Sequence, residues 1–147
     1  MRRDPMAMLP FIGYNASDYF AHWLHLGATH DASKLPRIFC VNWFRRDDDG
    51  GFLWPGFREN SRVLKWITQR IDGTADAVET PIGWVPAPGA MDLSGLDMSA
   101  ETIAAALHVD PAQWHAELEL IDEWFNTLGE VPAELCVELE ALRARLS

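Results

Sequence analysis

The sequence contains few cysteines, the residues that cross-link small domains and bind structural metal ions. Only two cysteines occur among its 147 residues, Cys40 and Cys136, and their wide separation excludes a disulfide framework and a paired-cysteine metal site. No apolar run approaches the roughly 18–20 residues that a membrane span needs. The N-terminal residues also lack the layout of a secretory signal. We therefore expect a protein without membrane contact that works in a reducing cytoplasm.

Sequence motifs of catalysis are missing as well. The chain has no Gly-Lys dipeptide and hence no P-loop, and neither GxGxxG nor GxSxG occurs. His, Cys and carboxylate residues do not reach the spacing or number that a catalytic metal requires, and no nucleophile stands beside a plausible base. The residues alone predict no catalytic group and no metal ligand.

Basic residues are scarce in the second half of the chain. Residues 74–147 carry 2 Lys+Arg against 14 Asp+Glu, whereas residues 1–73 carry 10 against 8. The acidic half repels phosphate backbones, which argues against a nucleic-acid partner. An anionic ligand would have to meet the first half, where six basic residues lie close together. They form either a solvated charged surface or a ligand contact: Arg37, Arg45, Arg46, Arg58, Arg62 and Lys65.

Aromatic residues are concentrated in the same region. Seven of them fall within residues 39–66, out of 7 Trp, 2 Tyr and 7 Phe in the whole chain. Such clusters usually form hydrophobic core, because each ring buries a large area. Interleaved with Arg and Gly, they can instead form a platform on which a base stacks. Composition leaves both interpretations open.

Short extended segments are predicted in the first third of the chain. Met6–Phe11 reads as a strand or an extended segment, and a helix capped by Asn15 or Ser17 runs to about Leu26. The β-rich residues Pro36–Phe44 predict a buried strand. The turn residues 45–51 and the apolar residues 52–54 then predict a hairpin.

Helices dominate the rest of the predicted structure. Asn60 or Ser61 caps a helix with Val63, Leu64, Ile67 and Ile71 on one face, and residues 73–98 form a loop with one short strand. Further helices begin after Ser99, at the Asp110-Pro111 capping box and after Pro132. Their apolar stripes predict that the last two helices form an antiparallel pair. The fold class is therefore α+β.

Residues 34–67, KLPRIFCVNWFRRDDDGGFLWPGFRENSRVLKWI, resemble the C-terminal region of GTP-dependent phosphoenolpyruvate carboxykinase. Shorter segments fit the same family in the same order: 2–15, 19–24, 79–86, 92–97 and 132–135. The resemblance implies that residues 1–147 are part of the mixed α/β nucleotide-binding lobe of the carboxykinase fold. It also implies a guanine-pocket half, residues 1–73, and a half made of a loop and C-terminal helices, residues 74–147.

The resemblance implies which residues form the guanine site. Phe44, Phe52 and Phe57 match the phenylalanines that surround and stack the base, and Asn60 matches the asparagine beside the guanine edge. The residues alone leave other roles open, because Phe44 and Phe52 could be hairpin core and Asn60 could be only a helix cap. Arg58 stands where the family has glycine, so we expect it to weaken guanine binding. The full set of expected nucleotide-binding residues is Trp43, Phe44, Phe52, Phe57, Arg58, Glu59 and Asn60.

The family converts oxaloacetate and GTP to phosphoenolpyruvate, GDP and CO₂, a step of gluconeogenesis. Its P-loop, its Mn²⁺ or Mg²⁺ ligands and its oxaloacetate-binding arginines lie upstream of the segment that this chain resembles. We therefore expect GTP and GDP as ligands, the upstream part of the same enzyme as a partner, and no turnover by these 147 residues alone. The alternatives are a stand-alone purine-nucleotide module or a remnant without function.

Overall fold

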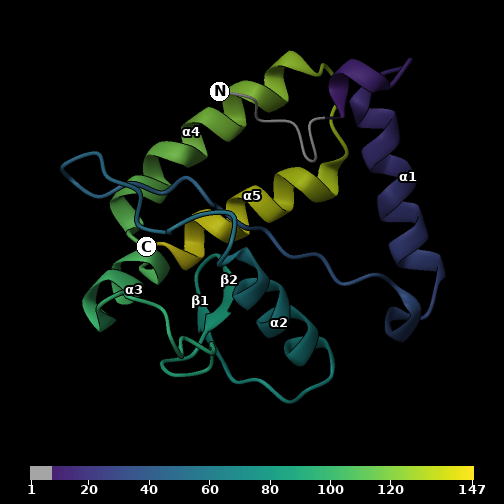
Figure 1. Cartoon of the computed structure of the whole chain (residues 1–147). Helices are drawn as coiled ribbons and strands as arrows, with labels where there is room; N and C mark the ends of the chain where they lie inside the picture. Colours follow the sequence, from purple (N-terminus) through teal and green to yellow (C-terminus); the bar gives the residue numbers. More distant parts are fainter. Residues whose placement is uncertain (1–7) are drawn as a thin grey trace. The chain divides into compact units, whose positions relative to one another are not determined.

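Helices form most of the regular structure in the computed structural model, which describes residues 8–147 (Figure 1). The chain divides into two compact units, one made of Met1–Pro36 with Asp110–Ser147 and the other of Arg37–Val109. The first holds α1 (Ala16–Thr29), α4 (Pro111–Thr127), α5 (Ala133–Arg145) and the 3-10 turns η2 (Leu9–Phe11) and η3 (Ala32–Lys34). The second holds α2 (Asn60–Ile71), β1 (Ala77–Thr80), β2 (Gly83–Pro86) and α3 (Ala100–Leu107). This mixture confirms the α+β prediction.

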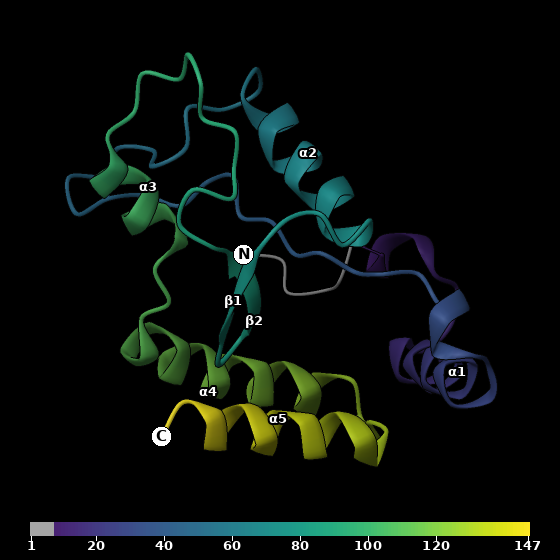
Figure 2. The same cartoon turned by 90° about the horizontal axis from the view of Figure 1, so that it is seen from below.

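The helices α4 and α5 run antiparallel and side by side, as their sequences predict (Figures 1 and 2). Leu118 is 0% exposed at the centre of their interface. It belongs to a cluster with Leu139 and Leu146, packed by further apolar side chains of both stripes: Trp114, Ile121, Phe125 and Leu142. Local interactions fix both ends of α4. Asp110 caps its start by accepting a hydrogen bond from the Ala112 amide, and Gly129 adopts a φ of 80° just beyond its end.

The first helix joins this unit through polar and aromatic contacts. Asn15, one of the two residues predicted as the cap, is its N-cap, and the side-chain oxygen accepts from the Ser17 amide at 2.8 Å. Asn15 Nδ2 donates to the Leu128 carbonyl at 3.0 Å, and the rings of Phe20 and Trp124 meet edge to face at 6.0 Å. The helix continues to Thr29, one turn beyond the predicted end.

No helix within residues 8–147 is both long and apolar enough to cross a bilayer.

One predicted extended segment is a 3-10 turn where the structure describes it. Leu9–Phe11 forms η2, with Pro at the first position and the Phe11 amide bonded to the Met8 carbonyl. The prediction of a strand at Met6–Phe11 is therefore wrong for Leu9–Phe11, because Pro10 fixes a φ that suits the start of a helical turn. Met6 and Ala7 lie outside the described residues.

The second unit is organised around three buried side chains, Trp54, Trp66 and Met91. Trp66 comes from α2 and its indole nitrogen donates to the Asp76 carbonyl at 3.2 Å, just before β1. β1 and β2 form an antiparallel hairpin in which Val78 pairs with Val85. The sequence predicted one short strand here, and the structure has two. This core holds α2, the hairpin and the segment that precedes α3.

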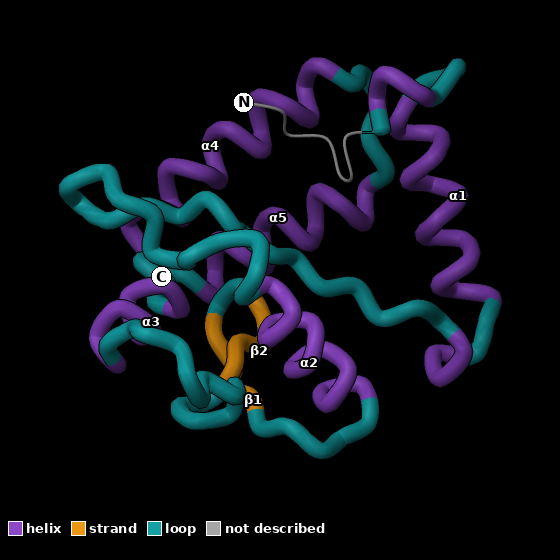
Figure 3. Tube along the Cα trace, in the orientation of Figure 1, coloured by secondary structure: helices purple, strands orange, loops and turns teal. Residues whose placement is uncertain are grey.

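The residues between η3 and α2 contain no strand, as the tube in Figure 3 shows. The prediction of a buried strand at Pro36–Phe44 is wrong for this chain, since Ile38 is 82% exposed. Phe39 and Trp43 do pack against the Trp54 cluster, so only one side of the segment is covered. The predicted hairpin is reduced to one isolated bridge between Arg46 and Phe52. A strand needs a hydrogen-bonded neighbour, and none is present among residues 8–147.

The start of α2 also differs from the prediction. Glu59 is the N-cap residue and makes no side-chain capping hydrogen bond, so neither Asn60 nor Ser61 is the cap. Val63 and Ile67 pack on the core as predicted, but Leu64 and Ile71 are exposed on the surface of the helix. The core formed by the described residues thus covers only part of the apolar face of α2.

Candidate functional site

The predicted nucleotide-binding residues lie on one continuous stretch of the second unit, from Trp43 to the first turn of α2. Its first part is a loop closed by hydrogen bonds from the Asp47 amide to the Gly51 carbonyl and from the Leu53 amide to the Arg45 carbonyl, each 2.9 Å. Gly50, with a φ of 84°, makes the turn. The Asp47 carboxylate accepts from the Gly51 amide at 2.7 Å and stiffens this loop.

Three phenylalanine rings of the stretch face solvent. Phe44 is 73%, Phe52 54% and Phe57 94% exposed. Phe44 and Phe52 therefore do not form hairpin core in this structure. Phe44 and Phe52 meet edge to face, with centroids 6.3 Å apart and planes at 62°. Rings at this angle do not sandwich a flat base between them, so a base must stack on an outer face. Trp43, in contrast, is partly buried against the core.

The face of Phe52 already carries a cation. The guanidinium carbon of Arg46 lies 4.0 Å from the Phe52 ring centroid, within the range of a cation–π contact. The same guanidinium donates to the Gly50 carbonyl, so it is held over the ring from the loop itself. A purine that stacks on this face must displace Arg46.

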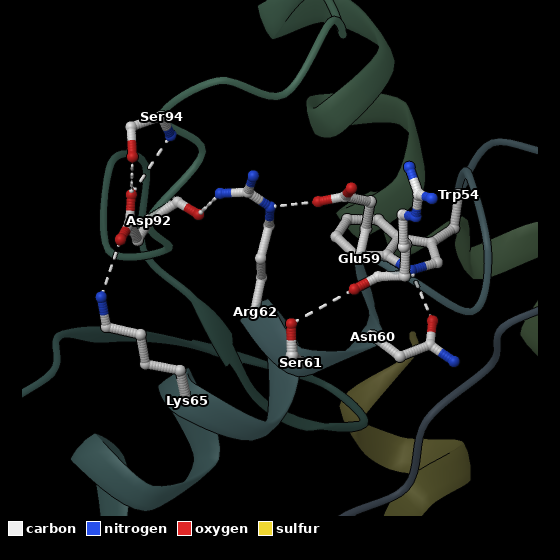
Figure 4. A network of polar contacts seen from close by, with 9 residues as sticks. Trp54, Glu59, Asn60, Ser61, Arg62, Lys65, Asp92 and Ser94 are labelled. Atoms are coloured by element: carbon white, nitrogen blue, oxygen red, sulfur yellow. Dashed lines mark hydrogen bonds and ion pairs between the residues drawn. The ribbon is translucent and has the colours of Figure 1, made fainter.

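Asn60 is held by a buried tryptophan. Trp54 Nε1 donates to Asn60 Oδ1 at 2.9 Å (Figure 4). An indole N–H can only donate, so this contact fixes which end of the Asn60 amide is the oxygen. The amide nitrogen points away from Trp54 in Figure 4. Asn60 therefore presents an N–H donor, together with the second lone pair of Oδ1, in a fixed orientation.

A polar network holds the first turns of α2 to the loop that follows the hairpin (Figure 4). Glu59 pairs with Arg62, and Arg62 Nη1 donates to the Asp92 carbonyl at 2.8 Å. The Asp92 carboxylate pairs with Lys65 at 2.7 Å and accepts from the Ser94 hydroxyl at 2.6 Å. The Lys65 ammonium, followed by the hydrogen bonds from Ser94, holds the pKa of Asp92 well below its usual range.

Most of the six basic residues singled out in the sequence make contacts within the second unit. Arg45 donates to the Ala106 and His108 carbonyls at the C-terminal end of α3, which suits the negative pole of that helix. Arg46 covers Phe52, and Arg62 and Lys65 bind the Asp92 loop. Arg58 is exposed beside Phe57, and only its carbonyl is engaged, by the Ser61 hydroxyl at 3.2 Å. Arg37 and Arg58 are thus the side chains most available to a ligand.

Within the described residues, no three His, Cys, Asp or Glu side chains gather where they could hold a metal ion. The residues of this part of the chain therefore do not fit the Mn²⁺ or Mg²⁺ that the family uses.

Two contributions at this site were missed from the sequence. In the sequence Trp54 is one ring of the aromatic cluster, and a spacing of six residues does not predict its hydrogen bond to Asn60. In the sequence Arg46 is one of six basic residues, and its position six residues before Phe52 suits a cross-strand pair in a hairpin. The turn signal at residues 45–51 could have found that pair.

Known proteins match this chain over almost its whole length. The family model described as the phosphoenolpyruvate carboxykinase C-terminal P-loop domain matches residues 1–145. Relatives named phosphoenolpyruvate carboxykinase [GTP] are 60% identical in Renibacterium salmoninarum and 57% in Paenarthrobacter aurescens, each over 147 residues and 99% of this chain. One from Treponema pallidum is 50% identical over 149 residues and the full chain.

The match covers only part of those relatives. The chain spans 24% of the length of each of these three proteins. The family model describes the matched residues as C-terminal domain. The chain therefore belongs to the GTP-dependent phosphoenolpyruvate carboxykinase family and corresponds to part of its C-terminal domain.

Proposed function

We propose that this chain provides the guanine-binding surface of a GTP-dependent phosphoenolpyruvate carboxykinase. The observation that carries the proposal is the juxtaposition, within residues 44–60, of exposed phenyl rings and an amide held in one orientation by a buried indole. Exposed rings in such density normally mark a binding site. Each base–ring stacking contact contributes about 1–3 kcal/mol.

Asn60 would read the edge of the base. Its Nδ2 donates to guanine O6, and the second lone pair of Oδ1 accepts from the guanine ring N–H. Adenine presents an amino group and an unprotonated ring nitrogen at those positions, so donor would face donor and acceptor would face acceptor. Because Trp54 Nε1 holds Oδ1 at 2.9 Å, the amide cannot flip to suit adenine without losing that bond. A site of this kind rejects the wrong base by leaving polar groups unpaired.

The reaction itself would need residues outside this chain. Phosphoryl transfer depends on positioning and on neutralising the charge of the phosphates, and the sequence has neither a P-loop motif nor a metal-ligand set. The residues that lie upstream in the relatives would supply these groups, whether they are joined to this chain or carried by a second polypeptide. In that assembly the family reaction, oxaloacetate with GTP to phosphoenolpyruvate, GDP and CO₂, becomes possible.

The unpaired cysteines fit a reducing compartment for this assembly. Cys40 and Cys136 are both free and exposed. Exposed thiols are typical of proteins that stay in the cytoplasm, and we place the proposed function there.

Calorimetry of the purified chain tests the proposal. GTP and GDP should bind saturably, with ATP weaker, and no carboxykinase turnover should appear with the chain alone. Equal binding of GTP and ATP would favour a general purine module, and absence of both would favour a remnant. Turnover by the 147-residue chain would contradict the proposed division of labour.

A further inference from the structure

The segment Arg37–Asn42 has an unusual combination of features for a solvent-exposed stretch. Its sequence RIFCVN carries one charged residue and is rich in β-branched and aromatic side chains. Ile38 is 82% and Val41 40% exposed, and Cys40 is exposed as well. These residues suit the inside of a sheet, yet solvent surrounds them.

The main chain of this segment is unpaired. Among residues 8–147, no backbone hydrogen bond joins the N–H and C=O groups of Arg37–Val41 to other residues, although the turns before and after are bonded. Backbone groups that become buried are nearly always hydrogen-bonded, so these groups need partners once the segment is covered. A row of free donors and acceptors in an extended chain is a template for pairing with another strand.

The two sides of the segment differ in what covers them. Phe39 packs on the Trp54 cluster and its ring meets Trp66 edge to face at 6.2 Å. Ile38 and Cys40, which alternate with it, face away from that core and are exposed. A strand that is apolar on both sides is typical of the interior of a sheet covered on both faces.

Arg37, at the start of the segment, is its one charged residue and gives it little of the protection that natural edge strands carry. Edge strands are usually blunted by Lys, Pro or inward-pointing charge, and between Arg37 and Asn42 there is no charge and no proline. Self-pairing is disfavoured, because each copy of the chain carries a net charge of −10. The matched part is 24% of the length of the relative from Renibacterium salmoninarum, so the rest of that protein is about three times as long. That remainder offers a partner for the segment.

We propose that Arg37–Asn42 is a docking strand for the upstream part of the carboxykinase chain. A strand from that part pairs with the free backbone groups, and an apolar layer from it covers Ile38 and Cys40. This inference rests on the proposed function, in that both assume that the chain works within a longer carboxykinase. It adds the surface at which the two parts meet.

The isolated chain gives the first test, by hydrogen exchange. The amides of residues 38–42 should exchange within about tenfold of the rates of an unstructured peptide, while those of α4 and α5 are protected. Protection of the segment in the dilute chain would overturn the proposal, because the segment would then be paired already. Protection that grows with protein concentration would overturn it too, since the occupant would be a second copy.

A chimera gives the second test. This chain replaces the matching residues of the Renibacterium salmoninarum carboxykinase, and alkylation of each cysteine is followed by peptide mass spectrometry. Cys40 should react at least about tenfold more slowly in the chimera than in the isolated chain, whereas exposed Cys136 on α5 serves as the internal reference. Equal slowing of both thiols, or none, would contradict docking at this segment.

Matched substitutions keep the test independent of folding of the chimera. Ile38→Asp places a charge on the proposed contact, and Val137→Asp places one on α5, where Val137 is 67% exposed. Neither should alter the thermal unfolding of the isolated chain. In co-expression with the tagged upstream part of the same relative, Ile38→Asp should reduce capture at least about tenfold, and Val137→Asp should not. Equal capture of both variants would overturn the proposal.

Failure of the inference is distinguishable from failure of the proposed function. Calorimetry with guanosine and GTP reports base binding by the isolated chain and does not require the upstream part. Guanine binding with a reactive Cys40 in the chimera would reject the docking strand alone. A protected Cys40 without guanine binding would reject the nucleotide site alone.

Discussion

Trp54 and Asn60 are joined by a hydrogen bond of 2.9 Å from the indole nitrogen to the amide oxygen. Trp54 is one of three buried side chains at the centre of its unit, and Asn60 is the first residue of α2. The bond therefore links the core to the position that would read a base. Asn60 lies inside the first turn of α2, because Glu59 occupies the N-cap position.

Asn60→Ala should lower both stability and base selectivity. Removing the acceptor leaves the N–H of Trp54 unsatisfied in a buried position, which costs about 1–3 kcal/mol in the free energy of unfolding. The preference for GTP over ATP should also disappear, because no amide remains to distinguish the two bases. Denaturant unfolding and calorimetry with both nucleotides measure these effects. Asn126→Ala, at an exposed position of α4, is the control and should change neither quantity; a stable variant that still prefers GTP would contradict the role of Asn60.

Arg46→Gln should increase the affinity for guanosine. The guanidinium lies 4.0 Å from the Phe52 centroid and competes with a stacking base. An exposed cation–π contact contributes about 0.5–1 kcal/mol, so its removal should tighten binding by roughly two- to fivefold. Guanosine is used because it has no phosphates that Arg46 could attract. Arg37→Gln removes another exposed charge of the same unit without uncovering the ring, and an equal gain in that variant would refute competition at Phe52.

Local signals predicted the helices well. The caps at Asn15, Ser99 and Asp110 lie where the sequence placed them, each bonded to an amide two or three residues ahead. The apolar stripes that meet at Leu118 and Leu139 were also predicted from their spacing. In each case the determining contacts lie within one helix or between two consecutive helices.

Features that depend on distant partners were predicted poorly. The β-rich sequence of Pro36–Phe44 predicted a strand, but a strand forms only beside another, and the described residues provide no neighbour. The prediction that Asn60 or Ser61 caps α2 is also wrong, because the helix begins at Asn60 with Glu59 at the N-cap. Only the family resemblance predicted the guanine site. A cluster of aromatic residues in a sequence does not reveal whether the rings form hydrophobic core or a surface on which a base stacks.

Asp92→Asn should remove a pH-dependent part of the stability. Lys65 and Ser94 hold the folded-state pKa of Asp92 below the value of an unfolded aspartate, which is about 3.9. The ionised carboxylate therefore stabilises the fold above about pH 4, and this contribution declines as the pH falls toward the folded-state pKa. The melting temperatures of the parent and the variant should differ at pH 7 and converge below about pH 4. Asp97→Asn, at an exposed position of the same loop, is the control; a gap that stays constant with pH would contradict the Lys65–Asp92 interaction as its source.

Arg58→Gly should strengthen the binding of GTP. The side chain is exposed between Phe57 and the start of α2, at a position where the family resemblance implies glycine. On the proposed site, a guanidinium there would restrict access to Phe57 and Asn60. We expect GTP affinity to rise roughly two- to tenfold, which corresponds to about 0.4–1.4 kcal/mol. Arg58→Ala separates the loss of bulk from the added backbone freedom of glycine, and Arg58→Lys keeps the charge. If Arg58 instead pairs with a phosphate, Arg58→Gly will bind GTP more weakly while guanosine affinity stays the same, and an unchanged or weaker GTP affinity in calorimetry contradicts the prediction.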